Sequence, residues 1–528
     1  MTDGNRTADG VSGAAGGAKG KGLRPGAIGL IATIVIGVAS TAPGYSIAAS
    51  LTSTVGSVGV QAPLIMVIAF VPMLFIAYAY KELNAVDPDC GTTFTWGTRA
   101  FGPVAGWMGG WAIIAADVIV MANLAQIAGQ YTFSFVGADG LAAEPRGWVT
   151  VVGVIWIFLM TYVCYRGIRL SARTQFVLLA IELVMLVVFA VVALAKVWGH
   201  TAGAGAIEPS WSWFNPADIG GWSAFSTGVL IAVFLYWGWD TAVAVNEETD
   251  DVTRTPGRAA VLSTLVLLVT YVLVTTAAVA FAGTGSTGTG LNNQDNAADS
   301  LSILGKAVFG GSGIGSVFSH LLILAVLSSA AASTQTTILP TARTTLSMAV
   351  WKALPDRFGS VKPRFMTPAF STWAMGAVSV VFFAALSYLK GGAPLGDLIA
   401  AIGLLIAFYY GLTGFASVWF FRRAMRTPRD ILVRGVLPGL GGLILLGLFV
   451  KASTAYYAAD YGNTSFHGVG GVFLLGYGSL LIGVVLMIVW FLVRPAYFRR
   501  SQTTLPISVH TGAPLASVTG EEHVTGAP

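Results

Sequence analysis

The sequence GVASTAPGY, residues 37–45, lies at the centre of the apolar run from Ala27 to Leu51. Its small residues and its Pro-Gly pair interrupt a segment that is otherwise apolar enough to span a membrane as a helix. A second interruption, FLYWGWD at residues 234–240, places Gly238 between aromatic residues near the centre of a later apolar run. Because non-helical backbone at membrane depth is tolerated only where it is buried in protein or lines a cavity, the two stretches predict two broken helices around one site.

The composition of the whole chain fits a membrane protein. Only 10% of its 528 residues are charged, against roughly 25% in soluble domains, and the mean hydropathy is +0.74. Apolar runs of roughly 20 residues, the length that crosses a bilayer, recur along the chain. Twelve spans are predicted, at residues 26–51, 61–81, 103–136, 147–165, 174–198, 222–246, 257–283, 314–341, 369–389, 396–421, 433–451 and 471–493.

The distribution of basic residues predicts the orientation. With the N-terminus in the cytoplasm, 24 of the 29 Lys and Arg residues fall on the cytoplasmic side, as the positive-inside rule requires. The first run is too long for a signal peptide, so we expect it to stay in the protein. Topology accounts for the net charge of +5, so no nucleic acid partner is predicted. We expect a multi-pass protein of the plasma membrane with both termini in the cytoplasm.

The domain prediction is a single membrane domain at residues 25–494. Residues 1–24 and 495–528 are poor in large apolar side chains and are predicted to be disordered cytoplasmic tails. Cys90 and Cys164 fall near the cytoplasmic side, where a structural disulfide is not expected. No metal site or cofactor is predicted.

The two interrupted spans are the first and the sixth, which are corresponding members of two five-helix halves. The predicted fold is therefore an all-α integral membrane protein with two inverted five-helix repeats, broken helices one and six, and two further C-terminal helices. The alternative is that Pro43 only kinks its helix and that Gly238 only allows close helix packing.

Several stretches resemble the amino acid, polyamine and organocation permeases. The segment from Phe234 to Glu248 is similar to the sixth-helix signature of that family. Further resemblances in order and spacing are Glu82 with Pro88, Gly91 and Phe94, then Ser333-Thr334-Gln335 leading to Arg343, Pro355 and Thr367-Pro368. The resemblance implies a substrate held between helices one, three, six, eight and ten.

An α-amino acid suits the two predicted breaks. Backbone N–H groups freed in helix one favour a carboxylate, and carbonyls freed in helix six favour an ammonium group. The carboxylate is assigned to Ser40, Thr41, Ala42 and Gly44, and the amine to the carbonyls of Phe234 and Tyr236, next to Trp237 and Gly238. Trp237 and Trp239 are candidate gates on the outer side, with ordinary packing as the alternative.

Three carboxylates fall within the predicted hydrocarbon depth, where charge is costly and usually functional. Asp117 is assigned to the far end or the amine of the substrate. Asp240 is expected either to cap the helix that follows the break or to act in the site. The third is Glu182, and a protonated structural acid is the alternative for all three.

Coupling is assigned by the resemblance. It places Glu182 where some proton-coupled relatives carry a buried lysine. It also implies that the region around Ser333 and Thr334 borders a cation site that relatives have between helices one and eight. Ser333 and Thr334 are candidate cation ligands there, with hydrogen bonds to their own helix as the alternative. Because no second acidic residue is evident on spans one or eight, H⁺ is preferred over Na⁺ as the coupling ion.

The predicted function is transport of amino acids by alternating access, as proton-coupled import. A polyamine or other organocation permease or exchanger is the alternative, with a Na⁺ symporter after it. An enzyme is disfavoured because there is no nucleotide-binding loop and no metal-ligand spacing. A channel would need charge rings or a repeated filter loop, which the sequence lacks. The substrate, the choice between symport and exchange, and the oligomeric state are left open.

Overall fold

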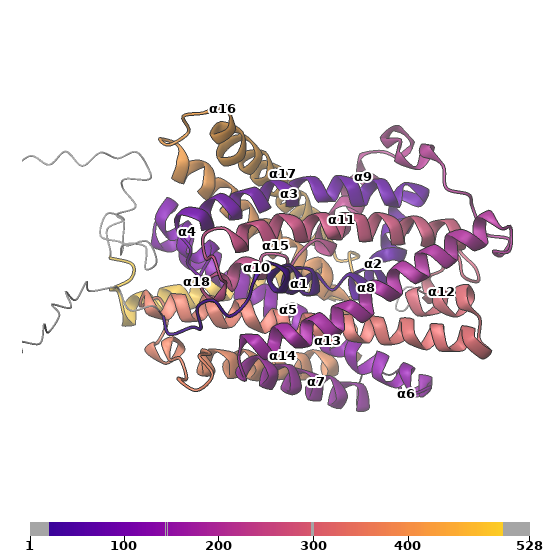
Figure 1. Cartoon of the computed structure of the whole chain (residues 1–528), viewed down its shortest axis with the longest axis horizontal. Coiled ribbons are helices and arrows are strands. Elements are labelled where there is room, and N and C mark those ends of the chain that lie inside the picture. Colours follow the sequence, from indigo (N-terminus) through magenta and orange to yellow (C-terminus); the bar gives the residue numbers. More distant parts are fainter. Residues whose placement is uncertain (1–20, 143, 145, 297–299, 500–528) are drawn as a thin grey trace, which may run out of the picture.

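The computed structural model describes residues 21–142, 144, 146–296 and 300–499, and most of these lie in helices (Figure 1). The long helices are α1 (Leu30–Thr41), α2 (Pro43–Val58), α3 (Ala62–Val86), α5 (Pro103–Phe135), α7 (Trp148–Tyr165), α8 (Ile168–Trp198), α9 (Trp222–Leu235), α11 (Thr255–Ala282), α13 (Gly313–Val350), α14 (Ala369–Tyr388), α15 (Leu398–Phe421), α17 (Leu437–Tyr456) and α18 (Gly471–Val493).

The connections contain shorter elements. The short α-helices are α4 (Thr93–Phe101), α6 (Asp139–Ala142), α10 (Thr241–Ala244), α12 (Ser300–Phe309) and α16 (Pro428–Asp430), and a π-helical turn, η8 (Ile431–Val436), leads into α17. The 3₁₀ turns are η1 (Gly59–Gln61), η2 (Trp211–Phe214), η3 (Pro216–Asp218), η4 (Asn246–Glu248), η5 (Gln294–Asn296), η6 (Asp356–Gly359) and η7 (Leu389–Asp397). Strands β1 (Ser465–Phe466) and β2 (Val469–Gly470) form a small antiparallel hairpin.

The long helices match the apolar runs of the sequence, since each predicted span falls on one helix or on two consecutive ones. Within the described part of the chain, nine segments are long and apolar enough to cross a membrane. Three of the nine, Leu30–Val86, Ala369–Phe421 and Pro428–Tyr456, run through several helices. The protein is therefore an all-helical, multi-pass membrane protein, whereas the number of twelve crossings and the inverted repeat stay predictions.

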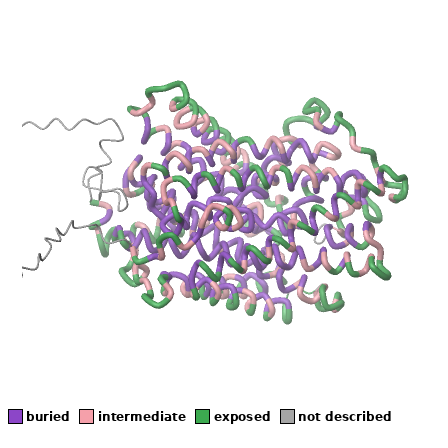
Figure 2. Tube along the Cα trace, in the orientation of Figure 1, coloured by how far each residue is buried: buried purple, intermediate pink, exposed green. Residues whose placement is uncertain are grey.

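The helices pack around a polar centre and expose apolar side chains on the outside. Helix α13 packs on α1, α5, α8 and α10, and α3 packs on α11. Figure 2 shows the buried residues concentrated along the middle of the bundle. On α18, by contrast, Leu481, Leu486 and Leu492 are exposed, as expected for side chains that face lipid tails rather than water.

The break in the first span is short. Helix α1 ends at Thr41 and α2 begins at Pro43, so only Ala42 lies between them, with φ of 47° and ψ of 65°. Pro43 stands at the first position of α2, where its missing N–H is not needed by the helix. Ser40, Thr41 and Gly44, which were assigned to the substrate carboxylate as part of the break, are therefore helical: Ser40 and Thr41 end α1, and Gly44 belongs to α2.

The break in the sixth span is longer. Residues 236–240 form turns between α9 and α10, and Gly238 has a φ of 116°. A Cβ at Gly238 would lie 2.8 Å from the carbonyl carbon and oxygen of Ser40, so glycine allows both the backbone angle and the contact between the two breaks. The interruption at residues 234–240 is thus non-helical from Tyr236 to Asp240, whereas Phe234 and Leu235 still belong to α9.

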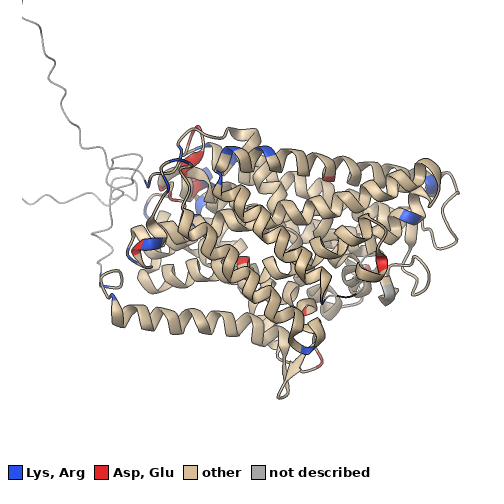
Figure 3. Cartoon of the chain, turned by 90° about the horizontal axis from the view of Figure 1, so that it is seen from below, with Lys and Arg blue, Asp and Glu red and all other residues tan. Residues whose placement is uncertain are grey.

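Charged residues gather at the end of the molecule that carries α4 and η4 (Figure 3). Several of them form ion pairs between segments distant in sequence, and these pairs are largely buried. The pairs are Arg99 with Asp87, Arg343 with Glu248, and Arg434 with Glu82.

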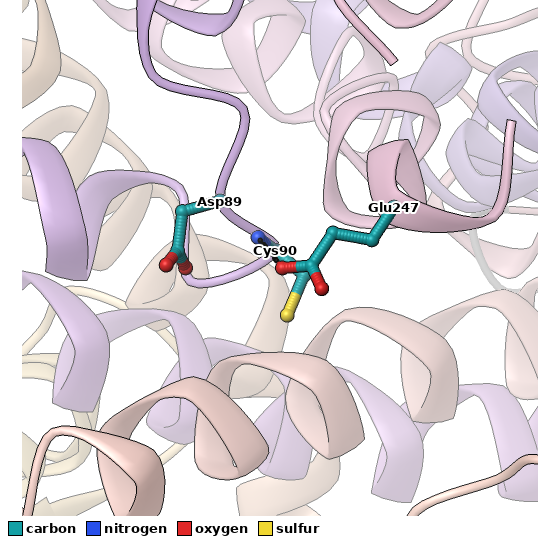
Figure 4. Close-up of side chains that lie close together, drawn as sticks. All are labelled: Asp89, Cys90 and Glu247. Atoms are coloured by element: carbon teal, nitrogen blue, oxygen red, sulfur yellow. Dashed lines mark hydrogen bonds between the residues drawn. The ribbon is translucent and has the colours of Figure 1, made fainter. Parts of the chain in front are cut away.

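Lys21 forms the most connected ion pair at this end. Its ammonium group, on a side chain 4% exposed, lies 2.8 Å from Asp89 Oδ2 and 2.6 Å from Glu247 Oε1. Figure 4 shows Asp89, Cys90 and Glu247 side by side, in an arrangement of the kind that can hold a metal ion. Here the Lys21 Nζ, 3.5 Å from Cys90 Sγ, supplies the positive charge of this group. The first segment of the chain is thereby tied to the α3–α4 connection and to η4.

The protonation states agree with this arrangement. Burial alone would raise the pKa of Asp89, but the Lys21 ammonium outweighs it, and the net pKa lies below its ordinary value. Burial would lower the pKa of Lys21, but Asp89, Cys90 and Glu247 raise it above its ordinary value. Burial, together with Glu247, also raises the pKa of the Cys90 thiol, so this group stays protonated near neutral pH.

A short part of each predicted tail, residues 21–24 and residues 495–499, belongs to the described structure. Leu23 is buried, and Tyr497 is buried with its hydroxyl 2.8 Å from Thr98 Oγ1 and 2.9 Å from the carbonyl oxygen of Pro103. Residues 21–24 and 495–499 therefore pack against the membrane domain. The rest of both predicted tails, residues 1–20 and 500–528, lies outside the described residues.

Replacement of Lys21 by Met should lower the free energy of unfolding by about 3–5 kcal/mol, because it leaves two buried carboxylates without their cation. Because the pKa of Asp89 is lowered by folding, its contribution to stability is fully present above its unfolded pKa of about 4. Because the pKa of Lys21 is raised by folding, its contribution is fully present below its unfolded pKa of about 10. The loss of stability in the variant should therefore be constant between about pH 5 and 9. Thermal unfolding of the detergent-solubilised protein at several pH values measures this. Lys352→Met is the matched control, since its pair with Asp356 is exposed and should be worth under about 1 kcal/mol. Equal losses in the two variants would contradict a stabilising role for Lys21.

Candidate functional site

A small cavity lies where the two breaks meet. Its lining includes Ser40 of α1, Asp117 of α5, Thr337 of α13 and Tyr409 of α15, together with Trp237, Gly238, Asp240 and Thr241 from the sixth span. These elements fall in spans one, three, six, eight and ten, which are the five spans that the family resemblance implied. The cavity offers about 10 Å³ to the centre of a water molecule, roughly the room for a single water. The site is therefore closed in this conformation and must widen before any larger molecule can enter.

Two carboxylates give the cavity its electrostatic character. Asp117 accepts a hydrogen bond from the Thr341 hydroxyl. Asp240 accepts hydrogen bonds from the hydroxyls of Tyr410, at 2.8 Å, and Tyr409, at 3.2 Å. No Lys or Arg lies among the residues that line the cavity. Such a site favours a positively charged group, such as an ammonium.

Trp237 closes one side of the cavity. Its side chain is 7% exposed, and its Nε1 donates a hydrogen bond to the Tyr409 hydroxyl. Because that hydroxyl also bonds to Asp240, the indole, the phenol and the carboxylate form one chain of hydrogen bonds. A movement of the sixth span at Trp237 would therefore disturb the partners of Asp240.

Glu182 lies beside the break of the first span. Its Oε1 accepts a hydrogen bond of 2.7 Å from the backbone N–H of Gly44 and another of 2.7 Å from the Ser329 hydroxyl. Its Oε2 is buried and has no hydrogen-bond partner among the described residues. The adjacent N–H of Tyr45 donates to Ser329 Oγ at 3.1 Å. The N–H groups freed at the start of α2 are thus occupied by side chains of α8 and α13.

Helix α13 links Glu182 to the cavity. Ser333, one turn after Ser329, donates a hydrogen bond of 3.0 Å to the carbonyl oxygen of Ser40. The Ser40 hydroxyl lies 2.8 Å from Thr241 Oγ1, and both residues line the cavity. Glu182 itself is not part of the lining. It is connected to the cavity through the backbone on both sides of Ala42.

The structure places four predicted substrate residues at the cavity and five away from it. Those that line it are Ser40, Asp117, Trp237 and Gly238. Those that do not are Thr41, Ala42, Gly44, Phe234 and Tyr236.

Most of these five residues already have partners for the groups that were expected to bind substrate. The Gly44 N–H is bound by Glu182, and the carbonyl oxygen of Phe234 accepts from the Trp237 N–H at 3.0 Å. The N–H of Ala42 donates to the carbonyl oxygen of Ala39 at 3.2 Å.

Three further predicted residues have local roles in this conformation. Trp239 packs on Tyr80 and Tyr410, toward the end that carries Lys21, rather than on the outer side where a gate was predicted. The Thr334 hydroxyl bonds to Ala330 of its own helix. Asp240 makes no capping hydrogen bond to α10 and is held by the tyrosines instead.

Sequence reasoning missed several residues of the site. Thr337 and Pro340 follow Ser333 by four and seven positions, so they share its helix face, and the same spacing relates Ile113 to Asp117. Helical periodicity from the predicted residues would have found all three. Tyr409 and Tyr410 carried a weaker signal, a pair of phenols in the middle of an apolar span. Ser329 stood out only as one of several small polar residues on its helix.

Comparison with known proteins identifies the family. The family described as amino acid permease matches residues 26–512 of this chain. A branched-chain amino acid permease of Lactococcus lactis is 25% identical over 65% of this chain and 71% of its own length. A branched-chain amino acid permease of Bacillus subtilis is 24% identical, over 73% and 79% of the two chains. The low-affinity putrescine importer of Escherichia coli is also 24% identical, over 72% and 79%.

The resemblance read from the sequence is thereby confirmed. The family and these relatives are transporters rather than enzymes, and their substrates are small molecules. With its apolar helices, its two broken spans and a match across nearly its whole length, this chain belongs to the amino acid permease family of membrane transport proteins.

Proposed function

We propose that this permease imports amino acids across the plasma membrane by alternating access, driven by protons. Both termini would lie in the cytoplasm, and twelve spans would be arranged as two inverted five-helix repeats and two further helices. The observation that carries the proposal is the contact of a buried carboxylate, Glu182, with the freed N–H of Gly44 at the break of the first span.

The substrate in this proposal is a zwitterion. Asp117 and Asp240 offer negative charge to its ammonium group, and no basic residue lies in the cavity lining to oppose it. The N–H groups of Gly44 and Tyr45 lie at the positive, N-terminal end of α2. They suit the carboxylate of the substrate once their present partners, Glu182 and Ser329, move away. Two of the relatives named above are branched-chain amino acid permeases, which supports this substrate class.

A second candidate substrate is a diamine or another organocation. The presence of two carboxylates in one lining favours it, because each could bind one ammonium group. One relative is a putrescine importer. The two candidates differ in whether the substrate carries a carboxylate for the break of the first span.

Glu182 is the proposed proton acceptor. A proton on Oε2 would leave both hydrogen bonds to Oε1 in place but weaken them, since bonds to an ionised oxygen are roughly twice as strong as neutral ones. The first turn of α2 would then be held less firmly. A sodium site is less well supported, because the hydroxyls of Ser333 and Thr334 are already bonded to backbone carbonyls.

Glu182→Gln should lower the accumulation of substrate driven by a pH gradient at least about tenfold. It should not affect the exchange of internal for external substrate. Exchange needs the site but not the proton cycle, and an amide cannot carry the proton. Uptake of labelled leucine into proteoliposomes under an imposed pH difference measures the first, and counterflow the second. Glu208→Gln is the control, since that glutamate is exposed in a loop. If the Glu182→Gln protein still concentrates leucine under a pH difference alone, Glu182 is excluded as the coupling residue.

Asp117→Asn should lower the uptake of lysine and putrescine relative to alanine by about tenfold or more, because a hydrogen bond to a charged group contributes about 1.5–3 kcal/mol. The amide has the same shape and can still accept the hydrogen bond from Thr341. Competition for uptake among the three compounds provides the ratio. An unchanged ratio would mean that Asp117 does not contact the cationic part of the substrate.

Gly238→Ala should reduce uptake by at least about tenfold at equal amounts of protein in the membrane. Its Cβ would press on the Ser40 carbonyl, and positive φ at a non-glycine residue costs on the order of 1–3 kcal/mol. Gly391→Ala is the matched control, since that glycine also has a positive φ, of 72°, but a Cβ there would meet no atom within 4 Å. Equal loss in both variants would mean that the contact between the two breaks is not what transport depends on.

A further inference from the structure

A second, larger hollow lies on the side of the molecule, away from the central cavity. It is a groove of about 500 Å³ between the start of α1 and the start of α8. One wall is formed by residues 27–29 with Ile31 and Ala32, and the other by Arg169, Ala172, Arg173 and Phe176. The spacing of three and four along α8 puts its four residues on one helix face. The predicted orientation puts the starts of both helices on the cytoplasmic side, since Arg24 precedes α1 and Arg166 precedes α8.

The walls of the groove are partly apolar and face outward. Ile31 is 71% exposed and Phe176 is 57% exposed. Both lie on helices with strongly apolar sequences, so the surface around them faces lipid rather than water. The groove is therefore accessible to molecules that are dissolved in the membrane.

The rim of the groove carries uncompensated positive charge. Arg169 and Arg173 are exposed, and neither forms an ion pair with a carboxylate among the described residues. Other arginines, such as Arg99, Arg343 and Arg434, are paired with Asp or Glu. A pair of free guanidinium groups one helical turn apart can bind a phosphate through several charge-assisted hydrogen bonds.

Two helix N-termini add to this charge. Both α1 and α8 begin at the groove, and neither has an acidic residue in its first turn or a side-chain cap. Helix N-termini favour anions because their first N–H groups have no partner within the helix. The Asp250 carboxylate also lies at the start of α1, where its Oδ2 would be 3.4 Å from a Cβ at Gly29. Its Oδ1 accepts from Asp251 N–H and from the Thr255 hydroxyl, and Asp250 is not part of the groove lining.

We propose that this groove binds an anionic phospholipid. Its phosphate would lie on Arg169 and Arg173 at the two helix N-termini, and an acyl chain would cover Ile31 and Phe176. A free phosphate ion would leave the apolar wall unused, and a neutral lipid would leave the two arginines unused. Basic pockets between helices on the cytoplasmic side of a membrane are suited to anionic head groups, which are abundant in that leaflet.

A lipid in this position would connect two functional elements. Helix α1 ends at the break at Ala42, and α8 carries Glu182. A lipid that bridges the starts of both helices would stabilise their present packing. Binding should therefore raise the thermal stability of the protein as well as being detectable directly.

The test is native mass spectrometry of the detergent-solubilised protein titrated with phosphatidylglycerol, with phosphatidylcholine as the zwitterionic comparison. The wild-type protein should retain one phosphatidylglycerol in preference to phosphatidylcholine, with a rise in its unfolding temperature. Arg169→Gln/Arg173→Gln should weaken that binding by about tenfold or more, since each basic residue near the surface contributes about 1 kcal/mol. Arg426→Gln/Arg429→Gln removes the same charge from exposed residues outside the groove and should bind as the wild type does.

Three outcomes would overturn the proposal. Equal binding of phosphatidylglycerol by the two double variants would show that general surface charge, not the groove, is responsible. Equal binding of phosphatidylcholine by the wild type would show a site for acyl chains only, and full displacement by inorganic phosphate would show a site for free anions. Arg169→Lys/Arg173→Lys guards against a folding defect, because it keeps the charge and should retain part of the preference for the anionic lipid.

Discussion

The hydrogen bond from the Gly44 N–H to Glu182 answers the main physical demand on this molecule, which is that backbone freed inside a membrane must find a partner within the protein. Ala42 turns the chain out of α1, and α2 restarts with a proline that has no N–H to satisfy. The next two N–H groups, of Gly44 and Tyr45, are met by Glu182 and Ser329. Helices α8 and α13 are therefore positioned around the break, and the central cavity is formed beside it.

The general features of the fold could be predicted from sequence because they depend on composition. A run of about 20 apolar residues crosses a membrane whatever its exact order, so the spans and the two interrupted ones were evident. The length of each break was not, since it depends on single backbone angles. Pro43 favours the restart of a helix directly after it, which confines the first break to Ala42. Gly238 instead adopts a φ of 116°, which the helix cannot continue through, and the second break is longer.

The site residues were predictable to the extent that they sit in the breaks or carry charge. Asp117 and Glu182 were found because carboxylates are rare at membrane depth. Tyr409 and Tyr410 were not, because phenols are common in membrane proteins, and only the packing of α15 beside α9 shows that these two hold Asp240, in the turns that follow α9. The carbonyl oxygen of Phe234, which was assigned to the substrate amine, accepts a hydrogen bond from the Trp237 N–H in this conformation. A helix break frees backbone N–H and C=O groups, but in a closed protein these groups form hydrogen bonds with neighbouring residues. Groups that the sequence suggests are available to a substrate are therefore already hydrogen-bonded in this conformation.

That occupancy bears on how a proton and a substrate would be coupled. The N–H groups proposed for the substrate carboxylate are the same ones that Glu182 and Ser329 hold in the closed conformation. Two carboxylates cannot share these donors without strong repulsion, because like charges at hydrogen-bonding distance disfavour each other's ionised form. A proton on Glu182 removes that conflict by removing one charge. In the proposed mechanism the proton and the substrate therefore favour each other's binding directly, across one turn of backbone, without a change passed through distant parts of the protein.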